Sequence, residues 1–355
     1  MDGRPGVVSM LGFGFQEHGS AEGLGYVDIA EPVAGPGLVR IRIHAAGFNR
    51  LDRFTLAGIP GVPVDRPHVL GSDGAGEVDS FGDDVTDLTV GTQVLVNPGL
   101  SDGTCDACLA GEESFCRNFR ILGEHTQGSA TRFIVVPRRN VYPLPRSLNY
   151  AEGAAVPLVF QTAWRALKTV AQLRPGERVA IIGAGGGVTT AAVQIAKRLG
   201  GNVAVASRTE AKAERTRSLG ADDILVFGED RPLDKVLWDW SGKRGVDVIF
   251  DSVGAPTVPR SLRALARGGR VVVIGATAGP LAEIDLRTLF WRQSSLRGST
   301  MANRSDFDEV LALLARGDLK PVLDSIFPFE QGAGAFSRLD APDLFGKVIL
   351  RGPTP

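Results

Sequence analysis

The spacing of apolar residues changes twice within one stretch near the middle of this 355-residue chain. Residues 179–182 form a continuous apolar run with the length and β-branched content of a buried parallel strand. From Val188 to Leu199 the apolar residues recur at helical intervals, and a pair of glycines then ends the helical pattern. Residues 203–206 are apolar again. The pattern therefore predicts a β-α-β unit.

Short apolar runs continue to alternate with stretches of helical length through most of the second half of the chain. Further strands are predicted at residues 224–226, 246–250, 271–274 and 295–298. Helices are predicted at residues 151–168, 210–219, 259–265 and 306–316. Short apolar strands separated by helices are typical of a doubly wound parallel sheet, so we predict an α/β fold for this part of the chain.

The first 150 residues have the period of two that is typical of half-exposed strands. In residues 38–48, Val39, Ile41 and Ile43 alternate with polar neighbours. Other short strands are predicted at residues 76–78, 93–96 and 131–136. The run at residues 346–350 is expected to return a strand to this irregular, β-rich domain.

Composition and charge exclude several classes of function. The net charge is −1 with 22% charged residues, which gives no electrostatic footprint for nucleic acid or an anionic membrane surface. No apolar run approaches the roughly 20 residues that span a bilayer. The N-terminus lacks the features of a secretion signal. We therefore expect a cytoplasmic enzyme with a small-molecule substrate and no nucleic-acid or membrane partner.

A glycine-rich turn joins the first strand of the β-α-β unit to its helix. Bare backbone at the head of a helix is the arrangement that binds a dinucleotide pyrophosphate. Compared with a strict GxGxxG pattern, Ala184 and Thr189 replace the first and last glycines. The alternative is a structural turn in an unrelated α/β protein. The expected cofactor contacts here are Gly185, Gly186, Gly187 and Val188.

The end of the second strand indicates which dinucleotide is bound. An NAD enzyme usually places an acidic residue there to bind the ribose hydroxyls, whereas this chain has Ser207, Arg208 and Thr209. Hydroxyl and guanidinium groups suit the 2′-phosphate of NADPH, and Lys212 is a further candidate. The alternative is that Arg208 and Lys212 are simply solvated.

Further cofactor contacts are expected after the later strands. In a doubly wound fold the ligand lies beyond the carboxyl ends of the strands. The residues at those ends are Ser252, Val253, Gly254, Gly275 and Thr277.

All three cysteines lie in one short segment. Cys105, Cys108 and Cys116 have the thiolate spacing of a structural zinc site, and Asp102 stands where a fourth ligand is needed. A carboxylate oxygen is a legitimate zinc ligand. We therefore predict one structural zinc; the alternative is a weakly binding or metal-free loop.

Several motifs in the same order along the chain resemble those of the medium-chain, zinc-type alcohol dehydrogenase/quinone oxidoreductase family. They are AAGFNRLD at 45–52, HVLGSDGAGEV at 68–78, the cysteine segment, PLVFQTAW at 157–164, the glycine turn, VDVIFDSVG at 246–254 and GKVIL at 346–350. The resemblance implies a GroES-like catalytic domain of residues 1–150 and 298–355 around a Rossmann domain of residues 151–297. It also implies a homodimer, and it places Thr162 against the nicotinamide.

The resemblance does not extend to the catalytic zinc. The three positions that hold this metal in zinc-dependent members correspond to Asn49, Ser72 and Leu158. An amide, a hydroxyl and an alkyl group are not a normal ligand set for Zn²⁺. We therefore predict that the catalytic zinc is absent.

Without that metal, the resemblance favours hydride transfer from NADPH to a quinone or an α,β-unsaturated carbonyl compound. Such a reaction needs hydrogen-bond donors near the carbonyl oxygen. The candidates are Asn49, Arg53 and His125, although Asn49 and His125 also suit purely structural roles. Two other functions stay open. One is a metal-dependent alcohol dehydrogenase with ligands such as Asp73 and His68, and the other is an inactive NADPH-binding sensor.

Overall fold

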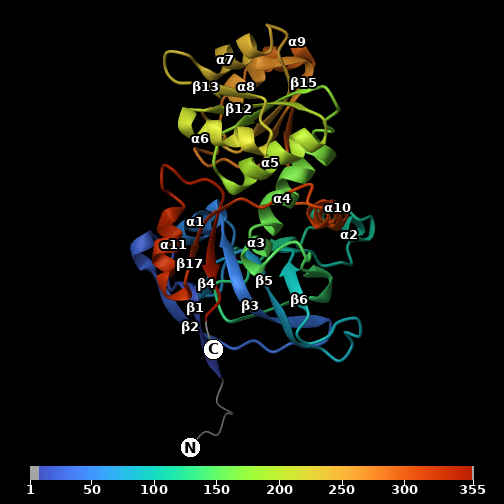
Figure 1. Cartoon of the computed structure of the whole chain (residues 1–355), viewed down its shortest axis with the longest axis vertical. Coiled ribbons are helices and arrows are strands. Elements are labelled where there is room, and N and C mark those ends of the chain that lie inside the picture. The colour runs from blue at the N-terminus through green and yellow to red at the C-terminus, as the bar shows by residue number, and fades with distance from the viewer. Residues whose placement is uncertain (1–7, 354–355) are drawn as a thin grey trace, which may run out of the picture. The chain divides into compact units, whose positions relative to one another are not determined.

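The computed structural model describes residues 8–353 and divides the chain into two compact units (Figure 1). Met1–Leu158 and Leu323–Pro355 form one unit, which we call the β-rich unit. Val159–Val322 form the other, which we call the parallel-sheet unit. Within the part of the chain that the structure describes, every helix is too short or too polar to cross a membrane.

The division on the C-terminal side falls later than residue 297, where we expected it. Helix α10 (Arg304–Ala315) is bonded to residues that follow α4 (Pro157–Trp164). Arg165 Nη1 lies 3.2 Å from Asp306 Oδ2, and Thr169 Oγ1 donates to Asp306 Oδ1 at 2.6 Å. These bonds keep the segment before β17 with the parallel-sheet unit.

The β-rich unit contains a seven-stranded sheet in the order β10-β6-β5-β3-β18-β17, with β9 also paired to β3. Its strands are β3 (Leu38–Phe48), β5 (Asp73–Phe81), β6 (Gln93–Val96), β9 (Phe133–Pro137), β10 (Val141–Pro143), β17 (Leu323–Phe327) and β18 (Lys347–Arg351). The predicted return of the C-terminal strand is confirmed, because β18 pairs antiparallel with β3. Figure 1 shows this as red strands beside blue ones.

Smaller elements complete the β-rich unit. A three-stranded sheet has the order β2-β1-β4, and a two-stranded sheet pairs β7 with β8. The strands are β1 (Ser9–Phe15), β2 (Leu24–Ala30), β4 (His68–Val69), β7 (Gly99–Leu100) and β8 (Arg120–Ile121). The helices are α1 (Arg50–Ala57), α2 (Asp106–Leu109), α3 (Tyr150–Gly153) and α11 (Gly332–Arg338). The core of this unit includes Phe13, Phe15, Ile41, Phe48 and Phe336, all fully or almost fully buried.

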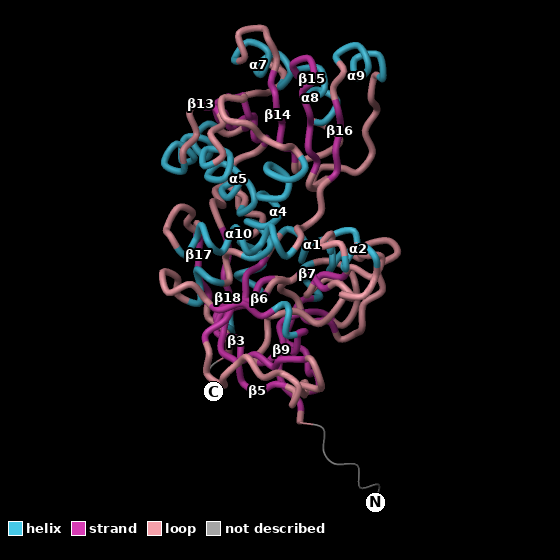
Figure 2. The backbone as a smooth tube through the Cα atoms, turned by 90° about the vertical axis from the view of Figure 1, so that its right-hand side faces the viewer, coloured by secondary structure: helices cyan, strands magenta, loops and turns pink. Residues whose placement is uncertain are grey.

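The parallel-sheet unit confirms the predicted doubly wound sheet. Its six strands have the order β13-β12-β11-β14-β15-β16 and are all parallel; Figure 2 shows β14, β15 and β16 side by side. They are β11 (Arg178–Ile182), β12 (Asn202–Ser207), β13 (Asp223–Val226), β14 (Val246–Asp251), β15 (Leu265–Val273) and β16 (Ser295–Gly298). Because β12 and β14 flank β11, the strand order reverses there, and ligands bind at such a switch point.

The parallel-sheet unit also contains helices, of which α5–α9 contact its strands. The helices are α4, α5 (Gly187–Arg198), α6 (Glu210–Glu214), α7 (Leu233–Trp240), α8 (Val258–Ala264), α9 (Leu286–Arg292) and α10. The apolar stripe of α5 is buried, including Ala192, Val193 and Ile195, as its helical spacing predicts. A π-helix at Arg165–Val170 follows α4 directly, and a 3-10 helix at Arg215–Leu219 follows α6. The structure therefore breaks each of two predicted helices into shorter pieces.

Candidate active site

The glycine turn leaves open space at the switch point of the parallel sheet. Gly183 and Gly185 follow β11 with φ angles of 93° and 96°, which favour glycine. A Cβ atom on Gly183 would meet no atom within 4 Å, and one on Gly186 would meet only Thr189 Oγ1 at 3.7 Å. The backbone here is therefore bare and accessible to a ligand.

The head of α5 adds backbone donors to this space. Thr190 N donates to Gly186 O at 3.0 Å, so the amides of Gly187, Val188 and Thr189 precede the helical hydrogen-bond ladder and suit an anion. Thr189 stands where the motif has its last glycine, and its hydroxyl donates to Gly186 O at 2.8 Å. This bond lets threonine replace glycine without leaving a buried hydroxyl unpaired.

A pocket of about 470 Å³ beside the glycine turn collects several predicted cofactor residues. Ser207, Arg208, Thr209 and Lys212 line it together with Gly183 and Ala184. Arg260, from α8, also lines the pocket, while Glu229 is its one acidic lining residue. Three cations against one carboxylate favour a phosphate ligand, and so the residues present fit a phosphorylated dinucleotide.

Two loops close the carboxyl ends of β14 and β15. Asp251 Oδ1 accepts hydrogen bonds from Val253 N at 2.8 Å and Gly254 N at 3.0 Å, which holds the turn after β14. Thr277 Oγ1 donates to Ser252 O at 3.0 Å and so joins the loop after β15 to that turn. Ser252, Val253, Gly254 and Thr277 are thus brought together, and Gly275 lies beside Ser252, with a Cβ atom there 3.4 Å from Ser252 O.

Thr162, the remaining predicted cofactor contact, lies on α4 in the same unit. It is buried, and its hydroxyl lies 3.9 Å from the sulfur of Met301. Met301 follows β16 and has a φ angle of 48°, a left-handed conformation that is uncommon for methionine.

In the β-rich unit, Asn49 forms a buried hydrogen-bonded group with two other polar side chains, Asp73 and Lys347. Lys347 Nζ donates to Asn49 Oδ1 at 2.5 Å and to Asp73 Oδ2 at 2.7 Å, and Asn49 Nδ2 donates to the same Asp73 oxygen at 2.9 Å. The side chain of Lys347 is 3% exposed and that of Asp73 is fully buried. Leu158 N donates to Asp73 Oδ1 at 2.7 Å. Both carboxylate oxygens of Asp73 are therefore occupied.

A second buried carboxyl group, Asp52, supports the backbone around this group. Asp52 Oδ2 accepts from Asn49 N at 2.6 Å, which caps α1, and Asp52 Oδ1 accepts from Gly71 N at 2.7 Å. Complete burial raises the pKa of Asp52 to about 6, although the two backbone amides and Lys347 oppose this shift. The Asp52 carboxylate therefore fixes Asn49 and the Gly71–Ser72 backbone relative to each other.

The residues at the catalytic-zinc positions do not fit a zinc ion. The oxygen of Asn49 is held by the ammonium group of Lys347, which would repel a divalent cation. Ser72 offers a neutral hydroxyl, and Leu158 offers no ligand atom. The other proposed ligand, His68, is buried with its Nε2 atom 3.1 Å from Gly123 O. Asn49, Ser72 and Leu158 thus offer neither thiolate nor imidazole, and the one imidazole named, that of His68, is bonded to the backbone.

The other two predicted catalytic residues, Arg53 and His125, have partners outside the Asn49 group. The guanidinium of Arg53 forms an ion pair with Asp340 and lies 4.9 Å from the ring centroid of Phe336. His125 Nδ1 accepts a hydrogen bond from Ile121 N at 3.2 Å. This bond fixes the proton of a neutral His125 ring on Nε2. Burial, with a smaller contribution from Arg120, lowers the pKa of His125, so the ring is neutral at pH 7.

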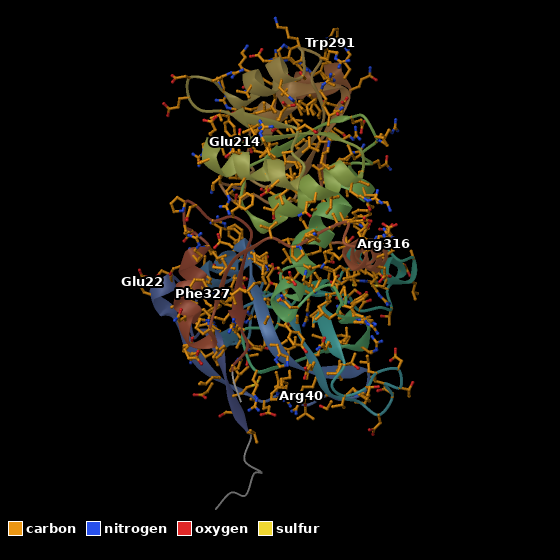
Figure 3. The ribbon with its side chains drawn as sticks, in the orientation of Figure 1. Glu22, Arg40, Glu214, Trp291, Arg316 and Phe327 are labelled. Carbon is orange, nitrogen blue, oxygen red and sulfur yellow. The ribbon has the colours of Figure 1, made fainter. Side chains whose placement is uncertain are left out.

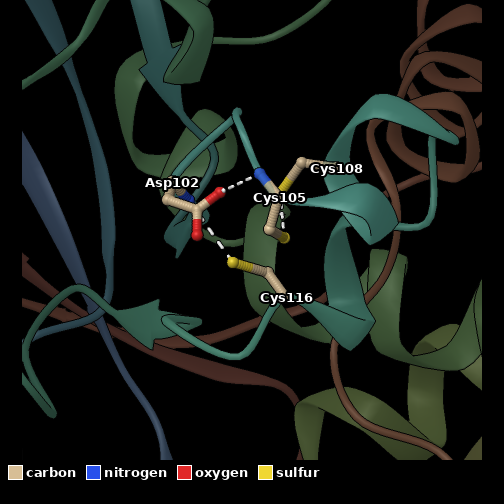
Figure 4. A group of neighbouring side chains, drawn as sticks. All are labelled: Asp102, Cys105, Cys108 and Cys116. Atoms are coloured by element: carbon tan, nitrogen blue, oxygen red, sulfur yellow. Dashed lines mark hydrogen bonds between the residues drawn. The ribbon is translucent and has the colours of Figure 1, made fainter.

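The cysteine segment places four ligand atoms together (Figure 4). Single atoms of Asp102, Cys105, Cys108 and Cys116 all lie within 4.8 Å of one another. Cys105 N donates to Asp102 Oδ1 at 2.9 Å, and this bond with others holds the pKa of Asp102 well below its usual range. The three thiols are free cysteines. These residues fit a tetrahedral structural zinc, which would link the ends of the loop.

Sequence reasoning missed two residues of these sites. Lys347 was assigned only to a strand, although a lysine beside the apolar run of β18 was a signal. Arg260 was overlooked because it lies on α8, far along the chain from Ser207 and Arg208, and only the folded pocket brings these residues together.

The chain is similar to known oxidoreductases along almost its whole length. Residues 187–316 match the zinc-binding dehydrogenase family, and residues 35–146 match the alcohol dehydrogenase GroES-like domain. An NAD-dependent alcohol dehydrogenase of Sulfolobus acidocaldarius is 31% identical over 344 residues, 94% of this chain and 98% of that protein. Quinone oxidoreductase of Homo sapiens is 30% identical over 330 residues, 91% of this chain and 92% of that protein. The crystal structure of an NAD-dependent alcohol dehydrogenase has a TM-score of 0.91 and 38% identity, covering 96% of this chain and 99% of that one.

Proposed function

The chain belongs to the medium-chain dehydrogenase/reductase superfamily of NAD(P)H-dependent oxidoreductases, and from this premise we propose that it is an NADPH-dependent, metal-independent reductase. Its substrates are quinones or α,β-unsaturated carbonyl compounds. The observation that carries the proposal is the Asn49–Asp73–Lys347 group, in which a buried ammonium binds the oxygen of Asn49, one of the three positions that correspond to metal ligands in zinc-dependent members. The name of the human relative, a quinone oxidoreductase, agrees with it.

NADPH, when bound, supplies the hydride; the chain supplies binding and hydrogen bonds. His125 is the proposed donor to the substrate carbonyl oxygen, because its Nδ1 is held by Ile121 N and its Nε2 carries the proton. Asn49 has a positioning role, since its amide nitrogen already donates to Asp73 and to Gly47 O. Arg53, bound to Asp340, would need a different rotamer to act as a donor.

The choice of NADPH rests on the end of β12. Ser207 is the last residue of β12, Arg208 and Thr209 follow it, and Lys212 lines the same pocket. An NAD-binding member usually has a carboxylate there for the ribose hydroxyls. A 2′-phosphate would instead find hydroxyl donors and cations. We place the pyrophosphate on the amides of Gly185, Gly186, Gly187 and Val188.

We also propose one structural zinc on the cysteine segment and a homodimeric assembly. The four ligand atoms of the cysteine segment support the zinc. The apolar surface of α9 beside the edge strand β16 supports the dimer.

The test is NADPH oxidation with a panel of quinones and enones, measured before and after brief treatment with a chelator. We expect turnover that survives the chelator and is faster with NADPH than with NADH. Loss of turnover on brief chelation would instead indicate a metal-dependent alcohol dehydrogenase. Tight NADPH binding without turnover on any carbonyl compound would indicate a cofactor-binding sensor.

A further inference from the structure

The cofactor pocket of the parallel-sheet unit is lined by arginines from two different elements. Arg208 follows β12, whereas Arg260 belongs to α8, which follows β14, and both residues line the same space of about 470 Å³. Strand β11 lies between β12 and β14, so the two elements flank the strand that leads into the glycine turn. A ligand at this switch point therefore borders an arginine from each side.

Arg260 shares its carboxylate partner, Asp234 of α7, with a second arginine. Arg260 Nη1 donates to Asp234 Oδ1 at 3.2 Å, and Arg263 Nε donates to Asp234 Oδ2 at the shorter distance of 2.9 Å. The side chain of Asp234 is 16% exposed, whereas that of Arg260 is 45% exposed. Because Arg263 also pairs with Asp234, Arg260 can turn to another anion without leaving a largely buried carboxylate unpaired.

The ionisation of Asp234 agrees with this arrangement. Burial raises the pKa of Asp234, but the hydrogen bonds and positive charge of Arg263, followed by the hydrogen bond of Arg260, lower it by more. The pKa of Asp234 therefore lies below its usual range, and the group is a carboxylate at neutral pH. Two guanidinium groups share this one negative charge. Of the three residues only Arg260 lines the pocket, so the excess positive charge is available there.

The charged residues that line the pocket match the charge of one phosphate group. The cations are Arg208, Lys212 and Arg260, and the acidic residue is Glu229, which leaves a net charge of +2. A phosphate monoester carries a charge of about −1.5 to −2 at pH 7. Without Arg260 the net charge of the lining would be +1, and part of the phosphate charge would stay uncompensated.

We propose that Arg260 is a second arginine of the 2′-phosphate site. When NADPH binds, the guanidinium of Arg260 leaves Asp234 and pairs with the phosphate, while Arg263 keeps Asp234 paired. This inference rests on the proposed function, because NADH has no 2′-phosphate for Arg260 to bind. Arg260 therefore adds to the preference for NADPH over NADH and does not contribute to the binding of the part that the two cofactors share.

The first experiment uses calorimetry to measure the affinity of the full chain for two probes, adenosine 2′,5′-bisphosphate and 5′-AMP. We expect Arg260→Ala to weaken binding of the bisphosphate about 10-fold, as for one charge-assisted hydrogen bond, and to leave the affinity for 5′-AMP unchanged. Arg244→Ala is the matched control, because Arg244 is exposed, precedes β14 at the opposite end of the strands and does not line the pocket. The control should bind both probes as the wild type does.

A second experiment tests the exchange of partners with Asp234→Asn, made in the wild type and in Arg260→Ala. Loss of the Asp234 charge frees Arg260, so we expect the affinity for the bisphosphate to rise roughly 2- to 5-fold in the wild type and not in Arg260→Ala. An equal gain in both backgrounds would come from the lost negative charge alone and would overturn the exchange. No gain in either background would overturn it as well.

The inference and the proposed function can fail separately. In one outcome the wild type prefers the bisphosphate, Arg208→Ala removes this preference, and Arg260→Ala, shown to be folded by its thermal unfolding curve, keeps it. That outcome overturns the role of Arg260 and leaves the choice of NADPH intact. If the wild type binds the bisphosphate no more tightly than 5′-AMP, the pocket does not select a 2′-phosphate, and both proposals fail.

Discussion

Lys347 carries a positive charge into a part of the β-rich unit that water does not reach. Its ammonium group donates hydrogen bonds to both Asn49 and Asp73. Asp73 also accepts a hydrogen bond from the backbone amide of Leu158. The ammonium thus places a buried positive charge directly against the Asn49 oxygen and the Asp73 carboxylate. Burying the Lys347–Asp73 ion pair costs free energy, because both charges lose their water. Removing only one partner costs more, because the remaining charge is then buried without a counter-charge.

We predict that Lys347→Met lowers the free energy of unfolding by about 3–5 kcal/mol, because Asp73 becomes a buried, unpaired carboxylate. Urea denaturation followed by fluorescence measures the loss. Lys197→Met is the control, since its ion pair with Asp222 is on the surface and should be worth about 1 kcal/mol or less. The double variant Lys347→Met with Asp73→Asn should recover part of the loss. A single variant as stable as the wild type would contradict this account.

Arg208 is the residue on which the choice of cofactor most depends. We predict that Arg208→Ala raises KM for NADPH by roughly 10- to 100-fold, as expected for one charge-assisted hydrogen bond, and leaves KM for NADH nearly unchanged. Initial rates with each cofactor measure the two effects. Arg316→Ala, an exposed residue that does not line the pocket, should change neither value (Figure 3). Equal changes for both cofactors would count against a 2′-phosphate at this position.

At the scale of elements, the cysteine segment has little packing of its own. Its helix α2 spans only Asp106–Leu109, and its strands β7 and β8 have two residues each. Leu109 and Phe115 point into solvent, with 74% and 70% of their surfaces exposed. A segment with so few buried apolar contacts depends on other links for its order, and the four ligand atoms around Asp102 would provide one.

We predict that protein purified without chelators contains about one zinc per chain, and that Asp102→Ala lowers this content. Elemental analysis measures the metal, and limited proteolysis reports the order of residues 99–121. The variant should be cleaved faster within this segment, whereas Asp106→Ala, which alters a neighbouring carboxylate outside the ligand group, should behave like the wild type. Metal-free wild-type protein with a protease-resistant segment would contradict the prediction.

The elements that sequence predicted well are those whose apolar period is unbroken. Strand β11 and helix α5 follow from local spacing, because parallel strands are buried on both faces and α5 has one apolar stripe. Strand β1 was missed because Gly12 and Gly14 interrupt its alternation. The fold explains why glycine is needed at position 14: a Cβ atom there would lie 1.8 Å from His68 O.

The site residues also fall into two groups: those that local spacing predicts and those that only the folded structure identifies. The cysteine ligands and the glycine turn lie close together in the sequence, so their spacing alone indicated them. Lys347 meets its partners across 298 and 274 residues of chain, which no local pattern can indicate. Residues whose chemistry depends on distant neighbours therefore needed the structure.

At the scale of the whole molecule, the parallel-sheet unit ends in an edge that favours a second copy. Strand β16 is the last in the sheet and pairs only with β15 among the described strands. Beside it, α9 exposes Phe290 and Trp291 to 66% and 69% of their surfaces, and Trp291 projects outward in Figure 3. Exposed strand edges and apolar clusters are both marks of an interface. An edge-to-edge pair of β16 strands would continue the sheet and cover α9.

We therefore predict that the wild type has twice the chain mass of 37.5 kDa in solution at micromolar concentration. Trp291→Asp combined with Leu296→Asp should give the monomer, because two buried carboxylates would face each other across the interface. Sedimentation equilibrium measures the mass, and NADPH binding by fluorescence shows whether the variant stays folded. Val33→Asp, which alters an even more exposed apolar residue of the β-rich unit, should remain dimeric. A monomeric wild type, or a dimer that survives both substitutions, would place the interface elsewhere or exclude it.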